Sequence, residues 1–495
     1  MTAEEHREVR HRGWITAVVM AATVMHALDA TIANVALPHM QGQLSATQDQ
    51  ISWVLTSYIV VSAIMTPLTG FLASRVGRRR LFFWAVTLFT IASMLCGVSQ
   101  SLEQIVLFRA LQGAFGAALI PLSQALLLDI YPPSRHSWAM AIWGVGVMVG
   151  PIMGPTLGGW LTDDFSWRWV FYINVPVGIL AGIGILVLVR DGAAVARRPF
   201  DLMGFALLGI GIGAVQMMLD RGELLDWFDS TEIVIEAAIA ALALAMCLIH
   251  LFTTRTPFVD LRLFEDRNFN IGLLLTATAG MIMIASAAIM PPFLQGLRGY
   301  PAIDVGLIMA PRGIGMMVSM LMVARLIAVF DQRLVMGVGF TIGAASIWPL
   351  TQSNLDIAMS TVLWSGVVQG FGLGFVFVPL STVMFATTPP ALRTDAAAMN
   401  ALVRNLGGSI GIAVMVATLT SRTQLVRAEL TENVNVFNPA WNAAAVGGER
   451  VWAMWDVEIT RQAAMIAYLV DFKLMMYYVV ATIPLLFLLK RTQRR

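Results

Sequence analysis

Fourteen segments of this chain are each long and apolar enough to cross a lipid bilayer. A membrane-spanning helix needs about 20 mostly apolar residues, and hydrophobic residues make up 58% of the 495 residues here. The segments are 14–36, 51–73, 81–99, 104–129, 138–161, 170–189, 202–219, 233–252, 269–292, 304–323, 334–352, 358–384, 395–420 and 465–489. The longest polar stretch, 421–464, is too short for a large soluble domain. The sequence therefore predicts an all-α integral membrane protein.

The distribution of positive charge predicts which side of the membrane each loop faces. With the N-terminus inside, the inner segments carry 21 arginine and lysine residues, and the short outer loops carry three. Because short cytoplasmic loops are enriched in these residues, we expect both termini in the cytoplasm, as segments 1–13 and 490–495. The net charge of +2 follows from this topology and does not indicate nucleic-acid binding.

One predicted span combines glycine and proline in an unusual pattern. Its key residues are Gly150, Pro151, Gly154, Pro155, Gly158 and Gly159. Three of the glycines recur every four residues and form one stripe on a helix, which lets a second helix approach closely. The prolines remove backbone donors and bend the helix. We predict a close-packed seal where two halves of the protein meet; a merely kinked packing helix is the simpler alternative.

An internal repeat divides the chain into two similar halves. Gln112-Gly113 and Pro121-Leu122-Ser123 recur 257 to 258 residues later as Gln369-Gly370 and Pro379-Leu380-Ser381. We therefore predict two six-helix bundles, at 14–190 and 269–489, with two inserted helices at 202–252. Two like halves around a central site are typical of transporters that expose the site to each side in turn.

Several motifs resemble those of a known family. They are the loop Gly70 to Arg80 (GFLASRVGRRR), Arg109 to Gly113 (RALQG), Leu28 to Pro38 (LDATIANVALP), Trp167 to Pro176 (WRWVFYINVP) and the glycine-proline stretch. Together they resemble the major facilitator superfamily, in particular its 14-helix drug:proton antiporter branch and the EmrB-type pumps within it. The resemblance implies the major facilitator fold with 14 transmembrane helices, and gating roles for Gly70, Arg75, Gly77 and Arg78. Ser74 stands where the family usually has an acidic residue.

The resemblance also implies a function. It implies a proton-coupled multidrug antiporter of the bacterial inner membrane that exports hydrophobic or amphipathic compounds from the cytoplasm or the inner leaflet. The proton gradient would replace any cofactor. A periplasmic adaptor protein would link the pump to an outer-membrane channel. We expect the outer segment 421–464 to help dock that adaptor; a passive surface loop is the alternative.

The few ionisable residues inside the spans are candidates for the chemistry, because such residues are costly in a membrane. Asp29 and Arg109 both lie roughly 9–11 Å below the outer surface, at about 1.5 Å per residue. Burial favours a neutral carboxyl group, whereas a nearby guanidinium favours the charged form. We hypothesise that Asp29 carries the proton, that Arg109 adjusts the proton affinity of Asp29 and that His26 lies on the same helix face as Asp29. A purely structural ion pair and a packing histidine are the alternatives.

Other polar groups inside the spans have less defined roles. The amides of Gln112, Gln124, Gln369 and Asn400 are predicted to line a central cavity or to form hydrogen bonds between helices. Arg404, as an arginine within a span, needs an anionic partner or water, and so does Arg312. Asp471 is a second titratable candidate. A metal site is not predicted, and neither is an enzyme, because we find no metal-ligand cluster, nucleophile-base grouping or phosphate-binding loop.

Two further functions remain open. One is a dedicated exporter of a single metabolite, such as a siderophore, a lipid or an amino-acid derivative, on the same fold. The other is a non-transporting membrane sensor or assembly factor, which would not need Asp29, Arg109 and the glycine-proline stretch together. A panel of drugs tested against cells that lack the protein separates broad from single-substrate export.

Overall fold

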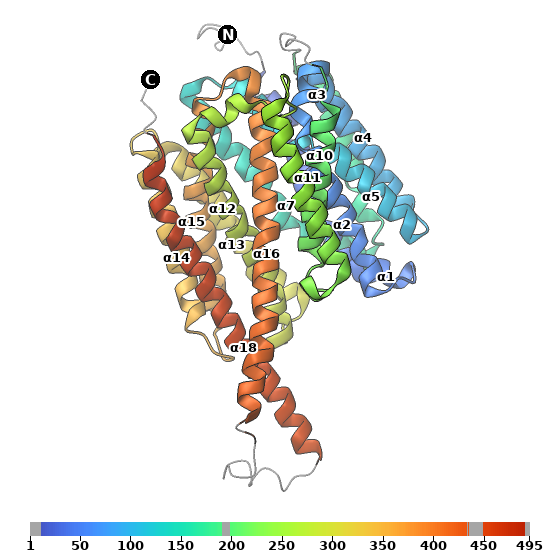
Figure 1. Ribbon diagram of the computed structural model, residues 1–495, viewed down its shortest axis with the longest axis vertical. Helices are drawn as coiled ribbons and strands as arrows, with labels where there is room; N and C mark the ends of the chain where they lie inside the picture. The colour runs from blue at the N-terminus through green and yellow to red at the C-terminus, as the bar shows by residue number, and fades with distance from the viewer. Residues whose placement is uncertain (1–10, 191–198, 433, 435–448, 491–495) are drawn as a thin grey trace.

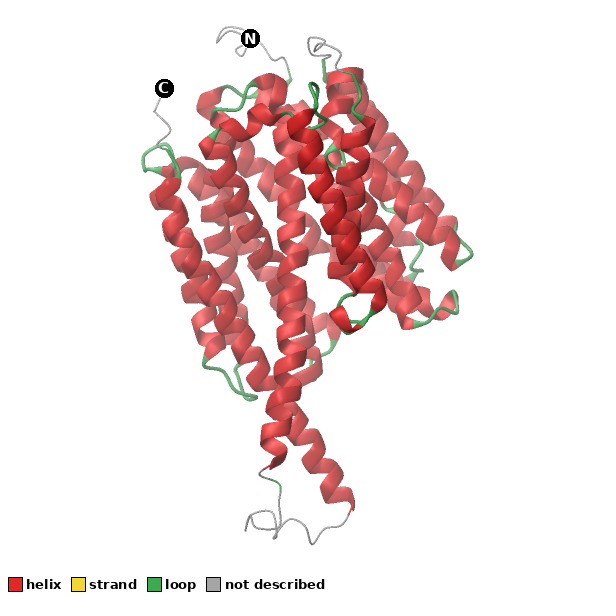
Figure 2. Ribbon diagram, viewed as in Figure 1, coloured by secondary structure: helices red, strands yellow, loops and turns green. Residues whose placement is uncertain are grey.

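The computed structural model describes residues 11–190, 199–432, 434 and 449–490. All regular secondary structure among these residues is helical (Figure 2). Within the described residues, thirteen helices are long and apolar enough to cross a membrane, and one bent pair brings the number of spans to 14 if it is counted as one. The predicted all-helical membrane fold is confirmed. Residues 1–10, 433, 435–448 and 491–495, which include parts of the predicted terminal segments and of 421–464, lie outside the described residues.

In the described part of the first half there are nine α-helices, three of which share a span with the preceding helix. They are α1 (Arg12–Gln43), α2 (Gln48–Met65), α3 (Leu68–Val76), α4 (Arg78–Val98), α5 (Leu102–Gly116), α6 (Leu119–Ile130), α7 (His136–Asp164), α8 (Trp169–Tyr172) and α9 (Asn174–Leu188). Helices α2 and α3 meet at 58°, beside Pro67, which lacks a backbone donor. Helix α1 packs against α7 and α9, and α5 packs against α2 and α4.

The second half repeats this arrangement of packed helices. It contains α12 (Arg267–Pro292), η5 (Phe293–Leu297), α13 (Ala302–Leu326), α14 (Gln332–Thr351), α15 (Met359–Ala386), α16 (Arg393–Glu432), α18 (Glu449–Thr482) and η8 (Ile483–Leu488). Helix α12 packs against α16 as α1 packs against α7, and α15 packs against α13 and α14. The two halves touch mainly through α7 and α13 and through α6 and α16.

The two inserted helices lie along the seam between the halves. They are α10 (Leu202–Arg221) and α11 (Thr231–Thr253). Helix α10 packs on α2 and also contacts α16. The Gln216 amide nitrogen donates a 2.8 Å hydrogen bond to Ser409 of α16, and Thr56 of α2 donates to the carboxylate of Asp220. The inserted pair therefore connects the two halves on this side of the molecule.

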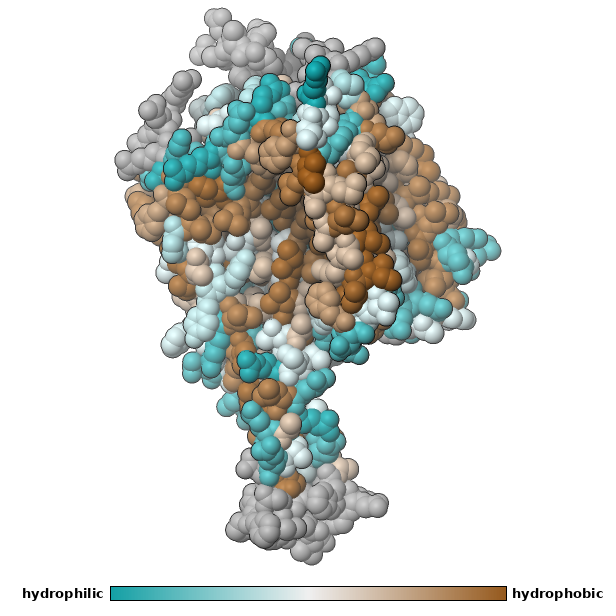
Figure 3. Space-filling model, in the orientation of Figure 1, coloured by the Kyte–Doolittle hydropathy of each residue, from teal (hydrophilic) through white to brown (hydrophobic). Residues whose placement is uncertain are grey.

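The surface has the character of a protein that lies in lipid. Apolar side chains cover much of the middle of the molecule, whereas polar ones gather at one end and on a projection at the other (Figure 3). Large apolar residues such as Val187, Ile249 and Phe487 are more than half exposed. We call the end where α1 begins and η8 ends the terminal face, and the opposite end the hairpin face.

The hairpin face carries a feature that the sequence analysis described only in part. Helices α16 and α18 continue beyond the other helices as an antiparallel hairpin (Figure 1). Helix α16 extends to Glu432 and α18 begins at Glu449, so the expectation of a loop over 421–464 is wrong at both ends of that segment. The hairpin helices lack the long apolar runs that predicted the other helices. They carry exposed ion pairs instead, such as Arg427 with Asp456 at 2.8 Å.

The glycine stripe of α7 packs inside the first half and does not lie where the halves meet. A side chain at Gly150 would collide with the backbone of Ala27 in α1, and one at Gly154 would collide with Thr31. The prediction of a seal between the halves is therefore wrong for this stripe, because a stripe of small residues indicates a close neighbour but not which one. Pro151 and Pro155 lie on the exposed face of α7.

A different face of α7 meets the second half. Gly144 contacts Met320 of α13, and Ile152 of α7 lies against Gly313 of α13. Gly407 and Gly408 of α16 pack against α12 within the second half, as the glycines of α7 pack against α1 within the first. A side chain at Gly407 would collide with the backbone of Ala277 in α12. Each half is thus held by a glycine-lined contact between its first and fifth spans.

Candidate functional site

Asp29 and Arg109 meet in the interior of the first half. The Arg109 Nη1 atom lies 2.8 Å from Asp29 Oδ2, and the two side chains are 1% and 0% exposed. The Arg109 Nε atom also donates to the Val54 carbonyl oxygen at 3.1 Å. The Asp29–Arg109 pair that matched depths in the sequence made possible is therefore formed. Asp29 lies on α1, Arg109 on α5 and Val54 on α2.

Two amide side chains complete the surroundings of the carboxylate. Gln112 Nε2 and Asn174 Nδ2 each donate a 2.8 Å hydrogen bond to Asp29 Oδ1. Gln112 Oε1 accepts from Arg109 Nη1 at 2.9 Å, and Ser93 on α4 bonds to Asn174 at 3.0 Å. The sequence analysis missed Asn174 as a site residue, although the residue lies within the quoted motif Trp167 to Pro176.

Local chain geometry explains why these groups converge. Ser101 caps the start of α5 by accepting from the Gln104 backbone N–H, which fixes the helix that carries Arg109 and Gln112 on one face, three residues apart. Asn174 is the first residue of α9, directly after the short α8. A polar side chain at that helix start can reach into the bundle without interrupting an apolar helix.

Aromatic rings enclose the other side of the guanidinium. The Tyr58 ring lies 4.1 Å from the Arg109 Cζ atom, and the Phe171 ring lies 5.8 Å from it. The Tyr58 hydroxyl group is 3.2 Å from His26 Nδ1. His26 is therefore linked to the ion pair through Tyr58, and it also packs beside Phe89 at a ring separation of 6.2 Å.

The arrangement limits the protonation chemistry of Asp29. Both of its oxygens accept hydrogen bonds from donors, and the group has no contact with solvent. These hydrogen bonds occupy three of the four lone-pair positions of the carboxylate, two on Oδ1 and one on Oδ2. A proton on the remaining Oδ2 position would neutralise the charge that Arg109 pairs with and so weaken the network. Proton uptake at Asp29 is thereby linked to relative movement of α1, α5 and α9.

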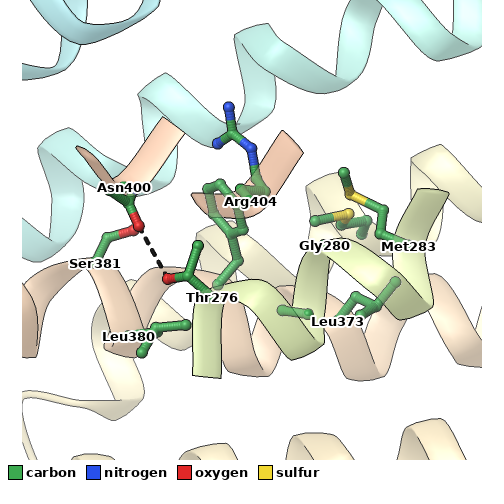
Figure 4. Close-up of a pocket in the computed structure, with 11 residues that line it drawn as sticks. Thr276, Gly280, Met283, Leu373, Leu380, Ser381, Asn400 and Arg404 are labelled. Atoms are coloured by element: carbon green, nitrogen blue, oxygen red, sulfur yellow. Dashed lines mark hydrogen bonds between the residues drawn. The ribbon is translucent and has the colours of Figure 1, made fainter. Parts of the chain in front are cut away.

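The remaining candidates lie mainly in the second half. Asn400 and Arg404 line a cavity between α12, α15 and α16 (Figure 4), and Gln369 and Arg312 line another beside α18. Gln124 is buried in α6 with its amide nitrogen 3.6 Å from Met140 Sδ. The prediction of one shared cavity is therefore wrong for the four amides, because the two halves separate them and Gln112 belongs to the Asp29 network.

Asp471 is buried in α18, with 0% exposure. Neither of its carboxyl oxygens has a hydrogen-bond partner among the described residues. It lies next to Phe472, which lines the cavity that contains Arg312. The structure thus places Asp471 apart from the Asp29 network.

Ionic contacts close the terminal face between the halves. Arg78 pairs with Asp129 at the end of α6 and donates to the Pro390 carbonyl oxygen at 2.7 Å. Arg393 of α16 binds the other oxygen of Asp129 at 2.8 Å. Asp129 therefore holds one arginine from each half, and we call this set the terminal lock.

The other residues of the signature loop shape the backbone around the terminal lock. Gly70 lies directly against Asp395 of the second half, so that a side chain there would collide. Gly77 has φ of 92°, a value that favours glycine. The Ser74 hydroxyl group donates to the Phe71 carbonyl oxygen at 2.7 Å, and Arg75 is exposed. In this chain the acidic partner of the arginines is Asp129, which lies outside the loop.

Comparison with known proteins places this architecture in a family. Residues 19–412 match the family described as Major Facilitator Superfamily. The chain belongs to the major facilitator superfamily. It is 41% identical over 434 residues to the multidrug export protein EmrB of Escherichia coli K12, covering 87% of this chain and 84% of that protein.

Other superfamily members give the same result. The chain is 37% identical over 433 residues to the fatty acid resistance protein FarB of Neisseria gonorrhoeae, covering 87% of this chain and 85% of FarB. The crystal structure of the human organic anion transporter MFSD10 has the same fold, with a TM-score of 0.60 at 13% identity, covering 95% of this chain and all of that one. The superfamily fold and the EmrB resemblance expected from the sequence are confirmed.

Proposed function

We propose that the protein is a proton-coupled multidrug efflux antiporter that exports hydrophobic or amphipathic compounds across a bacterial inner membrane. The observation that carries the proposal is the Asp29 carboxylate, which is fully buried and held by Arg109, Gln112 and Asn174. Similarity to EmrB and to FarB supports export of drugs or related toxic compounds.

In the proposed orientation the terminal face is cytoplasmic and the hairpin face is periplasmic. The arginine-rich inner segments support this orientation. The terminal lock then closes the cytoplasmic side, and Asp29 lies toward the periplasmic side of the bundle. A proton from the periplasm that binds Asp29 weakens this network, and loss of that proton to the cytoplasm re-forms the network and resets the transporter.

The hairpin of α16 and α18 is the proposed docking site for a periplasmic adaptor protein of a tripartite pump. Its part of α18 exposes apolar side chains, with Met454 71% and Val457 66% exposed. Such exposed apolar residues outside the lipid favour a protein partner. Replacing both by aspartate should abolish co-purification with the adaptor and leave transport in lipid vesicles unchanged. Retained co-purification would reject the hairpin as the docking site.

Transport in reconstituted vesicles tests the function itself. Purified protein is inserted into vesicles, a pH gradient is imposed, and the movement of protons and of several hydrophobic compounds is recorded. The proposal predicts exchange of protons for more than one compound, abolished when the gradient is collapsed. Export of a single compound would reject multidrug breadth, and export that ignores the gradient would reject proton coupling.

A further inference from the structure

Arg404 is a buried cation without a counter-ion. Its side chain is 8% exposed. In the part of the chain that the structure describes, it has neither an ion pair nor a hydrogen bond; its contacts are the rings of Trp143 and Phe377, each 6.0 Å from the Cζ atom. A buried charge without a partner is costly, so the position needs a partner that is not part of the folded chain itself.

The groups beside Arg404 in the same cavity are hydrogen-bond donors. Asn400 lies one turn earlier on α16, and its Oδ1 atom accepts a 2.9 Å hydrogen bond from Thr276 (Figure 4). This bond leaves both N–H groups of the Asn400 amide available. The Ser381 hydroxyl group also lines the cavity, and none of the lining residues is acidic. The polar part of the cavity therefore suits a group that accepts several hydrogen bonds.

The rest of the cavity is apolar and adaptable. Its lining includes Met283, Met316, Leu373, Phe377 and Leu380. Methionine side chains are flexible and polarisable, so they pack against chains of different shape. The lining thus combines a positive charge and hydrogen-bond donors with a surface for a hydrocarbon.

The position of the cavity suits a transported ligand. Arg404 extends from α16 toward Trp143 of α7, on the other half, and Trp143 stacks on Phe377 at 5.8 Å. A ligand held by Arg404 would lie at the contact between the halves, where alternating access exposes it to each side in turn. The Asp29 network lies within the first half, so the proton and the ligand would occupy separate sites.

We propose that Arg404, with Asn400 and Ser381, binds the anionic head group of amphiphilic substrates such as long-chain carboxylates. A guanidinium group holds a carboxylate through two parallel hydrogen bonds. The cavity is small in this structure, about 20 Å³, so the tail packs against the methionine side chains when the halves move apart and the cavity widens. The inference rests on the proposed export function and specifies its substrate class. A cationic head group would instead meet an unshielded positive charge.

Arg312 provides a matched control. It also carries a guanidinium inside the second half, but it lies in the other cavity and donates a 3.1 Å hydrogen bond to the Met283 carbonyl oxygen. Replacing it removes a positive charge from the same bundle; Arg312 does not itself line the Arg404 cavity and touches it through the backbone of Met283. The two variants therefore separate binding at Arg404 from a general effect of charge.

Equilibrium binding of three probes with the same tail tests the proposal. Purified full-length protein is immobilised, and binding of radiolabelled dodecanoate, dodecan-1-ol and dodecyltrimethylammonium is measured without a proton gradient. The wild type should bind dodecanoate at least about tenfold more tightly than the other two, as expected for hydrogen bonds to a charged group. R404Q should lose the preference for dodecanoate and keep its affinity for dodecan-1-ol. R404K should keep part of the dodecanoate preference, and R312Q should keep all of it.

Two results would overturn the proposal: equal binding of the three probes by the wild type, or an unchanged dodecanoate preference in R404Q. If R404Q does not fold, N400L takes its place, with an expected loss of dodecanoate preference of about tenfold. Binding needs no gradient, so a dodecanoate preference without gradient-driven export would retain the anion site and reject antiport. Gradient-driven export without a dodecanoate preference would reject the anion site and retain antiport.

Discussion

Asn174 donates a 2.8 Å hydrogen bond to Asp29 Oδ1, and so the first residue of α9 is tied to the middle of α1. The same amide nitrogen lies 3.0 Å from the Ser93 hydroxyl oxygen of α4. Asparagine is uncharged, yet its position makes it part of the polar network around the candidate proton site. Movement of α9 relative to α1 would change the donors available to Asp29.

Replacing Asn174 by alanine should destabilise the protein. The change removes a hydrogen bond to a charged group in a buried site, which is worth about 1.5–3 kcal/mol. The free energy of unfolding, measured by denaturant titration in detergent, should fall by that amount. Asn270→Ala is the control, because Asn270 is exposed and its side chain donates to an uncharged group, the Phe264 carbonyl oxygen. Equal effects of the two substitutions would show that Asn174 does not support Asp29.

Two glycines of α7 should respond differently to the same change. At Gly150 a methyl group would collide with the Ala27 backbone, which cannot move aside as a side chain can, whereas at Gly159 it would meet nothing within 4 Å. Gly150→Ala should lower the free energy of unfolding by about 1–3 kcal/mol. Gly159→Ala should leave it unchanged or raise it by up to about 1 kcal/mol. Similar melting temperatures for both variants would argue against the close contact between α1 and α7.

Removing Asp129 should open the terminal face. Asp129 binds Arg78 and Arg393 and is 24% exposed, so each pair contributes at most about 1 kcal/mol. Asp129→Asn should therefore shift the balance between closed and open states about 5- to 30-fold. A cysteine introduced at Ala396, which is 0% exposed, should then react faster with a maleimide reagent.

A control substitution at the hairpin face tests whether that effect is local. Asp163→Asn removes an exposed carboxylate that lies 3.8 Å from His39. It should leave the labelling rate of the cysteine at position 396 unchanged. The account of the terminal lock fails if Asp129→Asn leaves the rate unchanged as well.

Asp201 links stability of the inserted helices to pH. Burial alone would raise its pKa, but hydrogen bonds from the Gly204 backbone, His250 and the Phe258 backbone outweigh it and hold the pKa below its usual value. A lowered carboxyl pKa contributes stability above the unfolded value of about 4, and the contribution is lost as the pH falls through the folded value. Wild-type stability should therefore decline below about pH 4.

Asp201→Ala should remove both the pH-dependent contribution and the helix cap. The cap is the 2.9 Å hydrogen bond from the Gly204 backbone, and its loss should cost about 0.5–2 kcal/mol at neutral pH. Thermal unfolding at pH 7 and at pH 3 measures both effects. An equal difference between wild type and variant at the two pH values would contradict the assignment.

Most of the helical fold could be predicted from sequence because spanning helices are long and apolar. The 14 predicted segments each correspond to a helix or to a pair of successive helices in the structure. The hairpin start at Glu449 was missed because charged residues such as Asp456, Glu458 and Arg461 interrupt the apolar pattern in this part of α18. The bend beside Pro67 was missed for a different reason: hydropathy is averaged over a window and does not register a single break.

The candidate site was predicted in part. Asp29 and Arg109 are recognisable because charged residues stand out in apolar spans and their depths can be compared. Asn174 does not stand out, since an amide near a helix start is common. The spacing of Gly150 and Gly154 indicated a close contact but could not specify α1 as the partner, because the partner depends on tertiary packing.

Asp29→Asn is the substitution that tests the central claim most directly. Because it leaves Arg109 as a buried unpaired charge, the double variant Asp29→Asn, Arg109→Gln is measured beside it. In vesicles with an imposed pH gradient, both should fail to accumulate substrate against its gradient and should release no protons in exchange. Both should retain downhill movement of substrate. Full gradient-driven transport by Asp29→Asn at normal expression would contradict the assignment of Asp29 as the proton carrier.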